Sequence, residues 1–213
     1  MALAGRRPFP SWGGRRRRGP EAPDGDAAGA PRDLARDPDA DPEQVARQIC
    51  LSQLEHAPRT RAELAAVLSD RGVADDVAEA VLGRFSEVGL VDDALFAQMW
   101  VASRHRGRGL AGRALTQELR RKGVEDDVVR EAVAGLDPEQ EAATARALVD
   151  RRLRSTRGLP TDARVRRLAG MLARKGYPAG LAFRVVKEAL AEEGADPDEA
   201  GTPDTDDLAW FED

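Results

Sequence analysis

The chain has 213 residues, of which 33% are charged and 4% aromatic, and its net charge is −5. A single cysteine excludes an internal disulfide framework and fits a reducing compartment. The sequence has neither an apolar run long enough to cross a bilayer nor a signal peptide at its N-terminus, so we expect a cytoplasmic protein. The shortage of aromatic and β-branched residues favours amphipathic helices.

The net charge hides an uneven distribution along the chain. Residues 41–93 carry five bases and eleven acids, whereas residues 140–190 carry twelve bases and four acids. Residues 191–213 hold ten acids and no base. A basic stretch flanked by acidic segments predicts contact with a polyanion or an acidic protein surface.

One pattern occurs three times, at intervals of about fifty residues, which is typical of a repeat architecture. Each copy has two leucines four positions apart, then a base, a glycine and an apolar residue. The copies are Leu64, Leu68, Arg71, Gly72, Val73; Leu115, Leu119, Lys122, Gly123, Val124; and Leu168, Leu172, Lys175, Gly176, Tyr177. We expect a modular array in which each unit buries part of its apolar face against its neighbours. Such an array favours a binding protein over an enzyme.

The predicted elements begin after residues 1–40, whose Pro, Gly, Ala, Asp and Arg content predicts a disordered arm. The first repeat, 41–91, is expected to hold a helix over 43–56, a helix that opens at a capping box on Thr60, and a helix over 74–88. The second, 92–136, is expected to hold helices over 93–105, 111–122 and 125–135. The third, 137–193, is expected to hold helices over 138–155, 162–175 and 178–193. The Asp, Pro, Gly and Thr content of residues 194–213 predicts an acidic, disordered tail.

The sequence therefore predicts an all-α fold, a tandem array of three helix-turn-helix-like repeats with disordered termini. Gly72, Gly123 and Gly176 should each end a helix in the left-handed conformation. Cys50, Trp100 and Tyr177 are expected to be core residues, because each falls on an apolar helix face or in an apolar slot of the repeat.

The sequence contains no convincing catalytic or cofactor-binding motif. Gly107-Arg108-Gly109-Leu110-Ala111-Gly112 matches the dinucleotide fingerprint by letter, but a helix precedes it where that fingerprint needs a strand. We interpret it as a flexible basic connection between helices. The two histidines fall in different repeats, and no nucleophile–base pair or metal spacing accompanies them. We expect no catalytic residue, no metal and no cofactor.

The first unit also resembles a winged-helix or helix-turn-helix domain, so a tandem DNA-binding regulator is an alternative. The third helices of the first two repeats argue against it, because Asp75, Asp76 and Glu79, and then Asp126, Asp127 and Glu131, would face DNA phosphates. A scaffold that never touches nucleic acid is a weaker alternative. A steep dependence of affinity on salt for naked duplex would favour the DNA-binding alternative.

The candidate binding residues are bases of the second and third repeats. Dipole complementation at a helix end accounts for Lys122, but not for the arginines around the Gly-rich connection. The predicted partner-binding set is Arg104, Arg106, Arg108, Arg113, Arg120, Arg121, Lys122, Arg151, Arg152, Arg154, Arg166 and Arg167.

An ordered motif in the second repeat resembles the central signature of the RecX family. It comprises Gly89-Leu90-Val91-Asp92-Asp93-Ala94-Leu95-Phe96-Ala97, Trp100-Val101, Ser103-Arg104, Gly107-Arg108-Gly109, Arg113, Glu118-Leu119 and Lys122-Gly123-Val124. The third repeat adds Leu172-Ala173-Arg174-Lys175-Gly176-Tyr177. One departure is Ala111, where members often carry Pro.

The resemblance implies a non-enzymatic modulator that binds the filament of RecA recombinase on single-stranded DNA. It implies that such a protein limits filament extension, strand exchange and ATP hydrolysis, and so regulates recombination and DNA repair. Weak direct DNA binding is left open, and we expect a monomer without membrane contact. The acidic tail is expected to compete for the basic face, unless Trp210-Phe211 dock on the partner instead.

Overall fold

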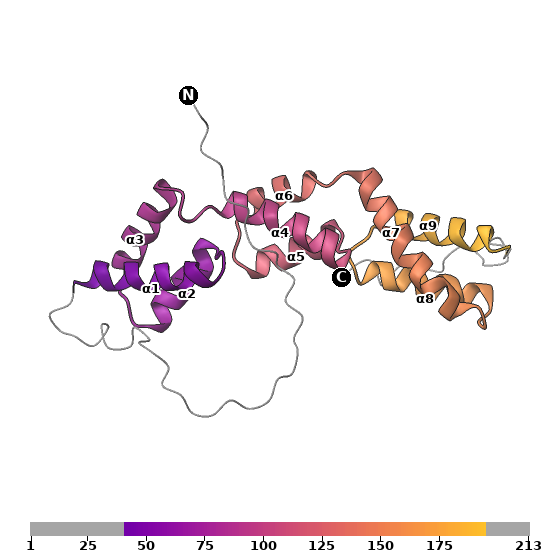
Figure 1. Cartoon of the computed structure of the whole chain (residues 1–213), viewed down its shortest axis with the longest axis horizontal. Coiled ribbons are helices and arrows are strands. Elements are labelled where there is room, and N and C mark those ends of the chain that lie inside the picture. Colours follow the sequence, from indigo (N-terminus) through magenta and orange to yellow (C-terminus); the bar gives the residue numbers. More distant parts are fainter. Residues whose placement is uncertain (1–40, 195–213) are drawn as a thin grey trace, which may run out of the picture.

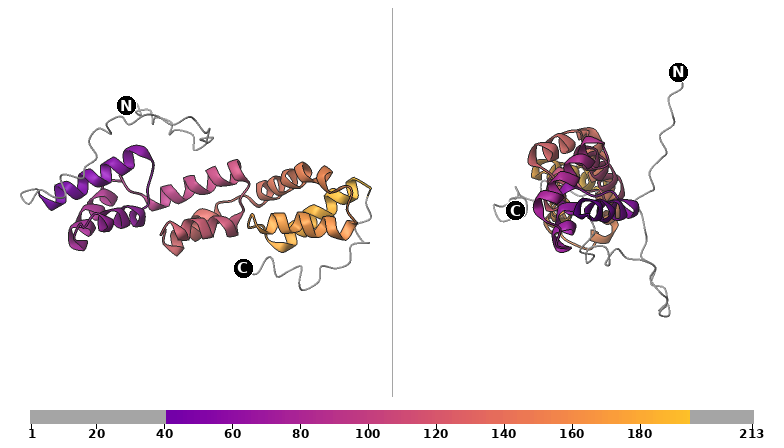
Figure 2. Two further views of the ribbon diagram at one scale, coloured as in Figure 1. Left: turned by 90° about the horizontal axis from the view of Figure 1, so that it is seen from below. Right: turned by 90° about the vertical axis from the view of Figure 1, so that its left-hand side faces the viewer.

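The computed structural model describes residues 41–194, and these residues are entirely helical outside their turns and connections. Three units of three helices follow one another along the long axis of the molecule (Figures 1 and 2). The first unit comprises α1 (Pro42–His56), α2 (Arg61–Asp70) and α3 (Asp75–Glu87). The second comprises α4 (Asp93–Arg108), α5 (Gly112–Arg121) and α6 (Asp126–Ala134). The third comprises α7 (Pro138–Leu153), the short 3₁₀ helix η2 (Arg154–Thr156), α8 (Thr161–Ala173) and α9 (Ala179–Glu192).

The helices start at the capping residues that the sequence indicated. The Asp41 and Asp137 side chains each accept a hydrogen bond from the amide two residues on, with a proline at the first helical position. Thr60 and Glu63 form the reciprocal capping box at the start of α2. These caps satisfy backbone N–H groups that a helix start leaves unpaired, so the predicted starts agree with the structure.

The three repeat glycines have φ values of 76° (Gly72), 74° (Gly123) and 86° (Gly176). These values lie in the left-handed region that a residue with a Cβ atom adopts only at a cost, which confirms the predicted role of each glycine at the end of a helix.

Each unit has its own hydrophobic core. One buried cluster runs from Val45 to Val91, a second from Phe96 to Ala132 and a third from Ala145 to Leu190, to which Ala111 of the second unit also belongs. The expectation that each unit buries part of its apolar face against its neighbours holds for a small part of that face, as Ala111 in the third core shows. Three helices are enough to enclose a core here, and the units meet through small contacts.

The second unit corrects the predicted connection. Helix α4 continues to Arg108, because a glycine at position 107 is tolerated within a helix and the left-handed residue is Gly109, at φ 61°. Only three residues join α4 to α5, and all three, Gly109, Leu110 and Ala111, are buried. The connection is short and packed, not flexible.

The junction between the first and second units is built on the Lys122–Gly123 corner. The Thr60 hydroxyl donates a hydrogen bond to the Lys122 carbonyl at 2.6 Å, and the Lys122 Nζ lies 2.7 Å from a Glu63 carboxylate oxygen. A Cβ atom added at Gly123 would collide with the Ala62 Cβ. The corner that ends α5 thus packs against the start of α2 in the preceding unit.

The junction between the second and third units repeats this arrangement with the Lys175–Gly176 corner. The Ala111 amide donates to the Lys175 carbonyl at 2.8 Å, and the Lys175 Nζ donates to the Arg108 carbonyl at 2.7 Å. The buried Tyr177 hydroxyl donates to the Gly109 carbonyl at 3.2 Å. Gly176 lies so close to the backbone of Ala114 that no Cβ fits between them.

The remaining core predictions agree with the structure. Cys50 and Tyr177 are fully buried, and Trp100 is 8% exposed and stacked on Phe96. Burial raises the pKa of the Cys50 thiol to about 11, as expected for a packed thiol. The predicted arm, 1–40, and nearly all of the predicted tail, with Trp210-Phe211, lie outside the described residues. Within residues 41–194, none of the helices has the length and apolarity that a membrane span requires.

Candidate polyanion-binding surface

Two of the candidate arginines converge on one carboxylate of the second unit. Glu118 lies 3.5 Å from the Arg104 Nε and 3.2 Å from an Arg108 guanidinium nitrogen, and it also accepts a hydrogen bond from the Trp100 indole at 2.9 Å. The Arg104 guanidinium is stacked over the Trp100 ring, 4.0 Å from its centroid. Arg104 is therefore held inside the fold, whereas the Arg108 side chain is 58% exposed.

The other bases of the second unit lie on separate surfaces. Arg106 is exposed on the opposite side of α4 from Arg104, because residues two apart do not share a helix face. Arg113 is half-buried in the first turn of α5. At the end of α5, Arg120 pairs with Asp126 at 2.8 Å and Arg121 is exposed. The Gly-rich connection therefore does not gather its arginines into one cluster.

Lys122 belongs to the junction between the first and second units. Its ammonium group is paired with Glu63 and lies 4.4 Å from the centroid of the Trp100 ring. Both partners of the ion pair are mostly buried, so this charge contributes to joining the units more directly than to an external partner.

In the third unit, the structure brings Arg152 and Arg167 together from two helices. Both line a pocket of about 180 Å³ between the end of α7 and helix α8. Its remaining lining residues are Ser155, Thr156, Leu168, Met171 and Arg174. Arg151 and Arg154 are exposed outside this pocket, and Arg166 pairs with Asp162 at 2.7 Å on the outer face of α8.

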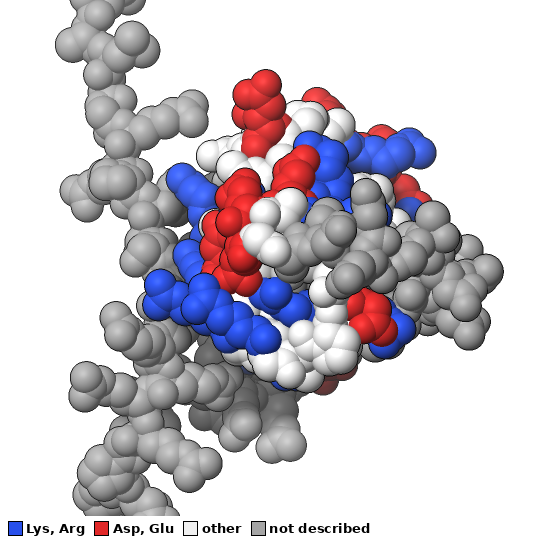
Figure 3. Space-filling view, turned by 90° about the vertical axis from the view of Figure 1, so that its right-hand side faces the viewer, with Lys and Arg blue, Asp and Glu red and all other residues white. Residues whose placement is uncertain are grey.

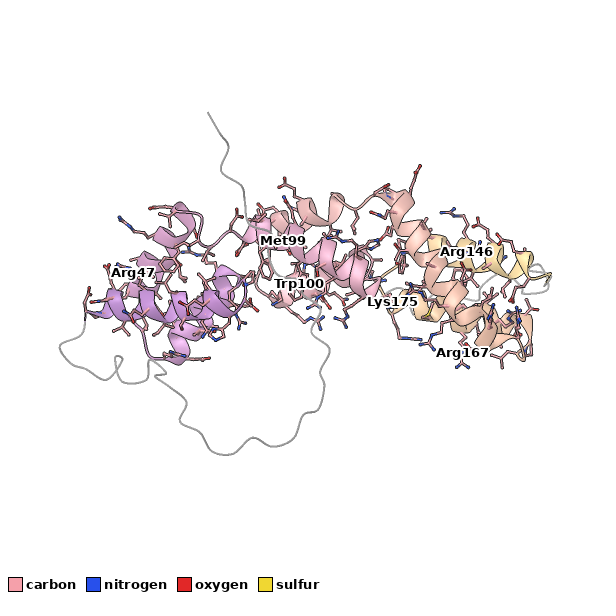
Figure 4. The ribbon with its side chains drawn as sticks, viewed as in Figure 1. Arg47, Met99, Trp100, Arg146, Arg167 and Lys175 are labelled. Atoms are coloured by element: carbon pink, nitrogen blue, oxygen red, sulfur yellow. The ribbon has the colours of Figure 1, made fainter. Side chains whose placement is uncertain are left out.

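Positive charge continues from the pocket toward the second unit through Lys175. Burial, then the positive charges of Arg108 and Arg152, lower the pKa of the Lys175 ammonium. Lys175 thus lies within the field of both arginines, one from each unit. Figure 4 places it between Trp100 of the second unit and Arg167 of the third, and Figure 3 shows basic side chains gathered at the lower left of the third-unit end.

Sequence reasoning missed three residues of this surface as site residues. Arg174 and Ser155 line the pocket, and Lys175 bridges it to Arg108. Arg174 and Lys175 had a usable signal, because they lie directly after α8, seven and eight residues beyond Arg167. The role of Glu118 had no signal in the sequence, because its three partners, Trp100, Arg104 and Arg108, come from a different helix. Arg164, another base of the third unit, is buried and paired with Glu193.

No group of acidic, histidine or cysteine side chains within residues 41–194 is arranged to hold a metal ion. A second, apolar hollow is lined by Pro58, Phe96, Met99, Trp100 and Ser103. The features of the described surface that could bind a partner are therefore the Lys and Arg side chains of the second and third units.

Comparison with protein families decides the identity of these units. Residues 46–85, 92–133 and 139–186 match the first, second and third three-helix domains of RecX, respectively. The chain belongs to the RecX family.

Individual relatives agree with this assignment. The chain is 59% identical over 181 residues to the regulatory protein RecX of Thermobifida fusca, an alignment that covers 84% of this chain and 92% of the relative. It is 56% identical over 182 residues to that of Streptomyces coelicolor, covering 85% and 97%, and 47% identical over 177 residues to that of Mycolicibacterium smegmatis, covering 81% and 90%.

Solved RecX structures share the fold. The crystal structure of RecX from Lactobacillus salivarius superimposes with a TM-score of 0.66 at 15% identity, covering 69% of this chain and 96% of that one. A second crystal structure of a regulatory protein RecX gives a TM-score of 0.64 at 22% identity, covering 70% and 72%. The family expectation from the sequence and the expected three-unit helical array are thereby confirmed, and the chain has the regulatory role of its family.

Proposed function

We propose that this chain binds the filament that RecA recombinase forms on single-stranded DNA, and that it inhibits filament extension, strand exchange and ATP hydrolysis without catalysing a reaction itself. The observation that carries the proposal is the charge order along the array. An acidic unit lies at one end, and bases outnumber acids in the second and third units, where Arg106, Arg121 and Arg152 are among the exposed bases. A filament of protein and DNA offers surfaces for both.

The elongated shape supports binding along a filament. The three units lie in a row, and specific hydrogen bonds at both junctions hold neighbouring units together. A row of units can contact several successive subunits or several nucleotides at once, which multiplies weak contacts.

The tandem helix-turn-helix alternative is disfavoured by the surface of the would-be recognition helices. The acids of α3 and α6 are exposed, so either helix would bring carboxylates toward the phosphates of a major groove. We therefore place the DNA contact on bases of the second and third units.

Measuring ATP hydrolysis by RecA on single-stranded DNA tests the proposal. Saturating amounts of the chain should lower the rate, and strand exchange should fall with it. Arg106, Arg108 and Arg121 changed together to Ser should weaken inhibition without unfolding, because exposed charge changes shift stability by no more than about 0.5 kcal/mol each. Arg104 is left in place because its guanidinium packs on Trp100.

A control of equal charge change lies on the first unit. Arg47, Arg71 and Arg84 are exposed there and can be changed together to Ser. This variant should inhibit like the wild type. A chain that leaves both ATP hydrolysis and strand exchange unaltered at saturation would contradict the proposed function.

A further inference from the structure

The pocket of the third unit has the form of an anion site. Arginines stand on its rim from two directions, Arg152 from α7 and Arg167 from α8, with Arg174 directly after α8, while Leu168 and Met171 supply an apolar floor. The buried Thr156 hydroxyl is already engaged, since it donates to the Leu153 carbonyl at 2.7 Å and accepts from the Arg164 Nε at 3.2 Å. The Ser155 hydroxyl is engaged as well, with the Arg152 carbonyl at 2.7 Å. The guanidinium groups of Arg152 and Arg167 are thus donors that a ligand would meet.

The charges of Arg152 and Arg167 are not neutralised by any carboxylate of residues 41–194. No carboxylate lines the pocket. Among residues 41–194, the acids nearest in sequence are paired elsewhere: Asp150 with Arg146, Asp162 with Arg166, and Glu193 with Arg157 and Arg164. Arg152 and Arg167 have no ion-pair partner in that part of the chain. The second unit is different, because there Glu118 lies between Arg104 and Arg108.

The chemistry of the rim favours a phosphate group. A guanidinium presents paired N–H donors that match two oxygens of a phosphate, and guanidinium groups converging on one hollow suit a tetrahedral anion with oxygens on several sides. The apolar floor offers nothing to a second polar group, so the remainder of a ligand must leave along the surface.

The surroundings favour a polymer over a small ion. Lys175 adjoins Arg174 and donates its Nζ hydrogen bond to the Arg108 carbonyl, so positive charge continues from the pocket across the unit boundary. A nucleic acid strand carries its negative charges at regular short intervals along the backbone, and such a row of cations follows that pattern. A free phosphate would use only the pocket.

From this geometry we infer that the pocket formed by Arg152, Arg167 and Arg174 binds one backbone phosphate of a single DNA strand, which then passes over Lys175 toward Arg108. The inference deepens the proposed function, on which it rests for its biological setting, because it assigns the DNA of the filament, and not the recombinase, to the third unit.

Fluorescence anisotropy of a labelled single-stranded oligonucleotide, without recombinase, tests this inference on the full chain. The variant R152Q/R167Q should lose at least about tenfold in affinity at low salt, and the slope of log affinity against log salt should fall by about 0.7, the value for one phosphate on a single strand. The control R151Q/R154Q removes equal charge from neighbouring exposed positions outside the pocket and should lose much less.

Further variants and probes separate the remaining outcomes. R152K/R167K keeps the charge but removes the paired donors, so its affinity for the oligonucleotide should lie between those of the wild type and R152Q/R167Q. Circular dichroism checks that all variants fold. Equal losses in the pocket and control pairs would overturn the inference in favour of diffuse attraction. Inorganic phosphate is also added as a competitor, at a concentration equal to that of the DNA phosphates. If it abolishes the difference in affinity between the pocket variant and the control variant, the assignment to a polymer is wrong.

A poly-glutamate probe distinguishes an acidic protein partner. If the pocket variant loses affinity for poly-glutamate and keeps its affinity for DNA, the assignment to DNA is wrong. The proposed function fails separately, in the recombinase assay: a wild-type chain that leaves ATP hydrolysis unaltered contradicts that function while the oligonucleotide result still decides the pocket.

Discussion

The Arg71–Gly72 corner of the first unit and the Lys175–Gly176 corner of the third share a sequence pattern and a left-handed glycine, yet their surroundings differ. A Cβ atom at Gly72 would meet no atom within 4 Å, whereas one at Gly176 would collide with the backbone of Ala114. The first corner only ends a helix. The third also joins two units, which shows that one repeated motif has acquired a second role wherever a unit precedes it.

The largest expected effect comes from breaking this second role. Gly176→Ala should lower the free energy of unfolding of the third unit by about 3 kcal/mol, because steric collision adds to the cost of a positive φ. Gly72→Ala carries only the backbone cost and should lose about 1 kcal/mol. Urea denaturation followed by circular dichroism measures both. Equal losses would mean that the junction does not constrain Gly176.

A smaller effect should follow from removing the tyrosine hydroxyl at the same junction. Tyr177 occupies the slot that Val73 and Val124 fill in the other units, and its hydroxyl reaches Gly109 of the preceding unit. Tyr177→Phe should cost about 1 kcal/mol, since it leaves a buried carbonyl without its donor. Unchanged stability in the same denaturation experiment would show that the carbonyl finds another donor.

The ion pair at the other junction should contribute somewhat less. A double-mutant cycle on Lys122→Met and Glu63→Gln should give a coupling energy of about 0.5 to 1 kcal/mol that decreases with added salt. Arg71→Met is the matched control, because Arg71 holds the equivalent position on an exposed corner. A coupling energy of zero at low salt would mean that the Lys122–Glu63 ion pair does not stabilise the junction.

The smallest effect concerns acid. Hydrogen bonds from Arg164 and Arg157 lower the pKa of Glu193, and one from Arg146 lowers the pKa of Glu192. A carboxyl with a lowered pKa in the folded state stabilises the fold above its unfolded pKa, and this stabilisation is lost as the pH falls through the folded pKa. Glu193→Gln should therefore reduce the drop in melting temperature between about pH 5 and about pH 3. Glu43→Gln on the first unit is the control, and a parallel drop in both variants would contradict the assignment.

Much of the fold followed from local signals in the sequence. The capping box at Thr60, the Asp-Pro starts and the three glycines placed most helix ends to within two or three residues, because these signals act within a single turn. The end of α4 was placed too early, since the glycines of residues 107–112 were interpreted as a flexible connection, whereas the helix continues to Arg108 and is capped by Gly109.

The candidate surface was less predictable, because it depends on how helices are oriented. Arg152 and Arg167 belong to two different helices and line one pocket only because α7 and α8 pack with those faces together. Arg104 looked like a free cation, but Glu118, which neutralises it, projects from another helix. Counting charges along the chain located the basic region, whereas the pairing of each charge required the packed structure.

The separation of the three cores has a consequence for cooperativity. Each core holds its own unit together, whereas a few hydrogen bonds and one glycine corner hold each junction. In such a linear array, the nearest-neighbour coupling is weak relative to the energy of a unit, and unfolding departs from a single two-state transition. Calorimetry should then give an enthalpy larger than the van't Hoff value, and a junction variant such as Gly176→Ala should widen that gap by letting the third unit melt on its own.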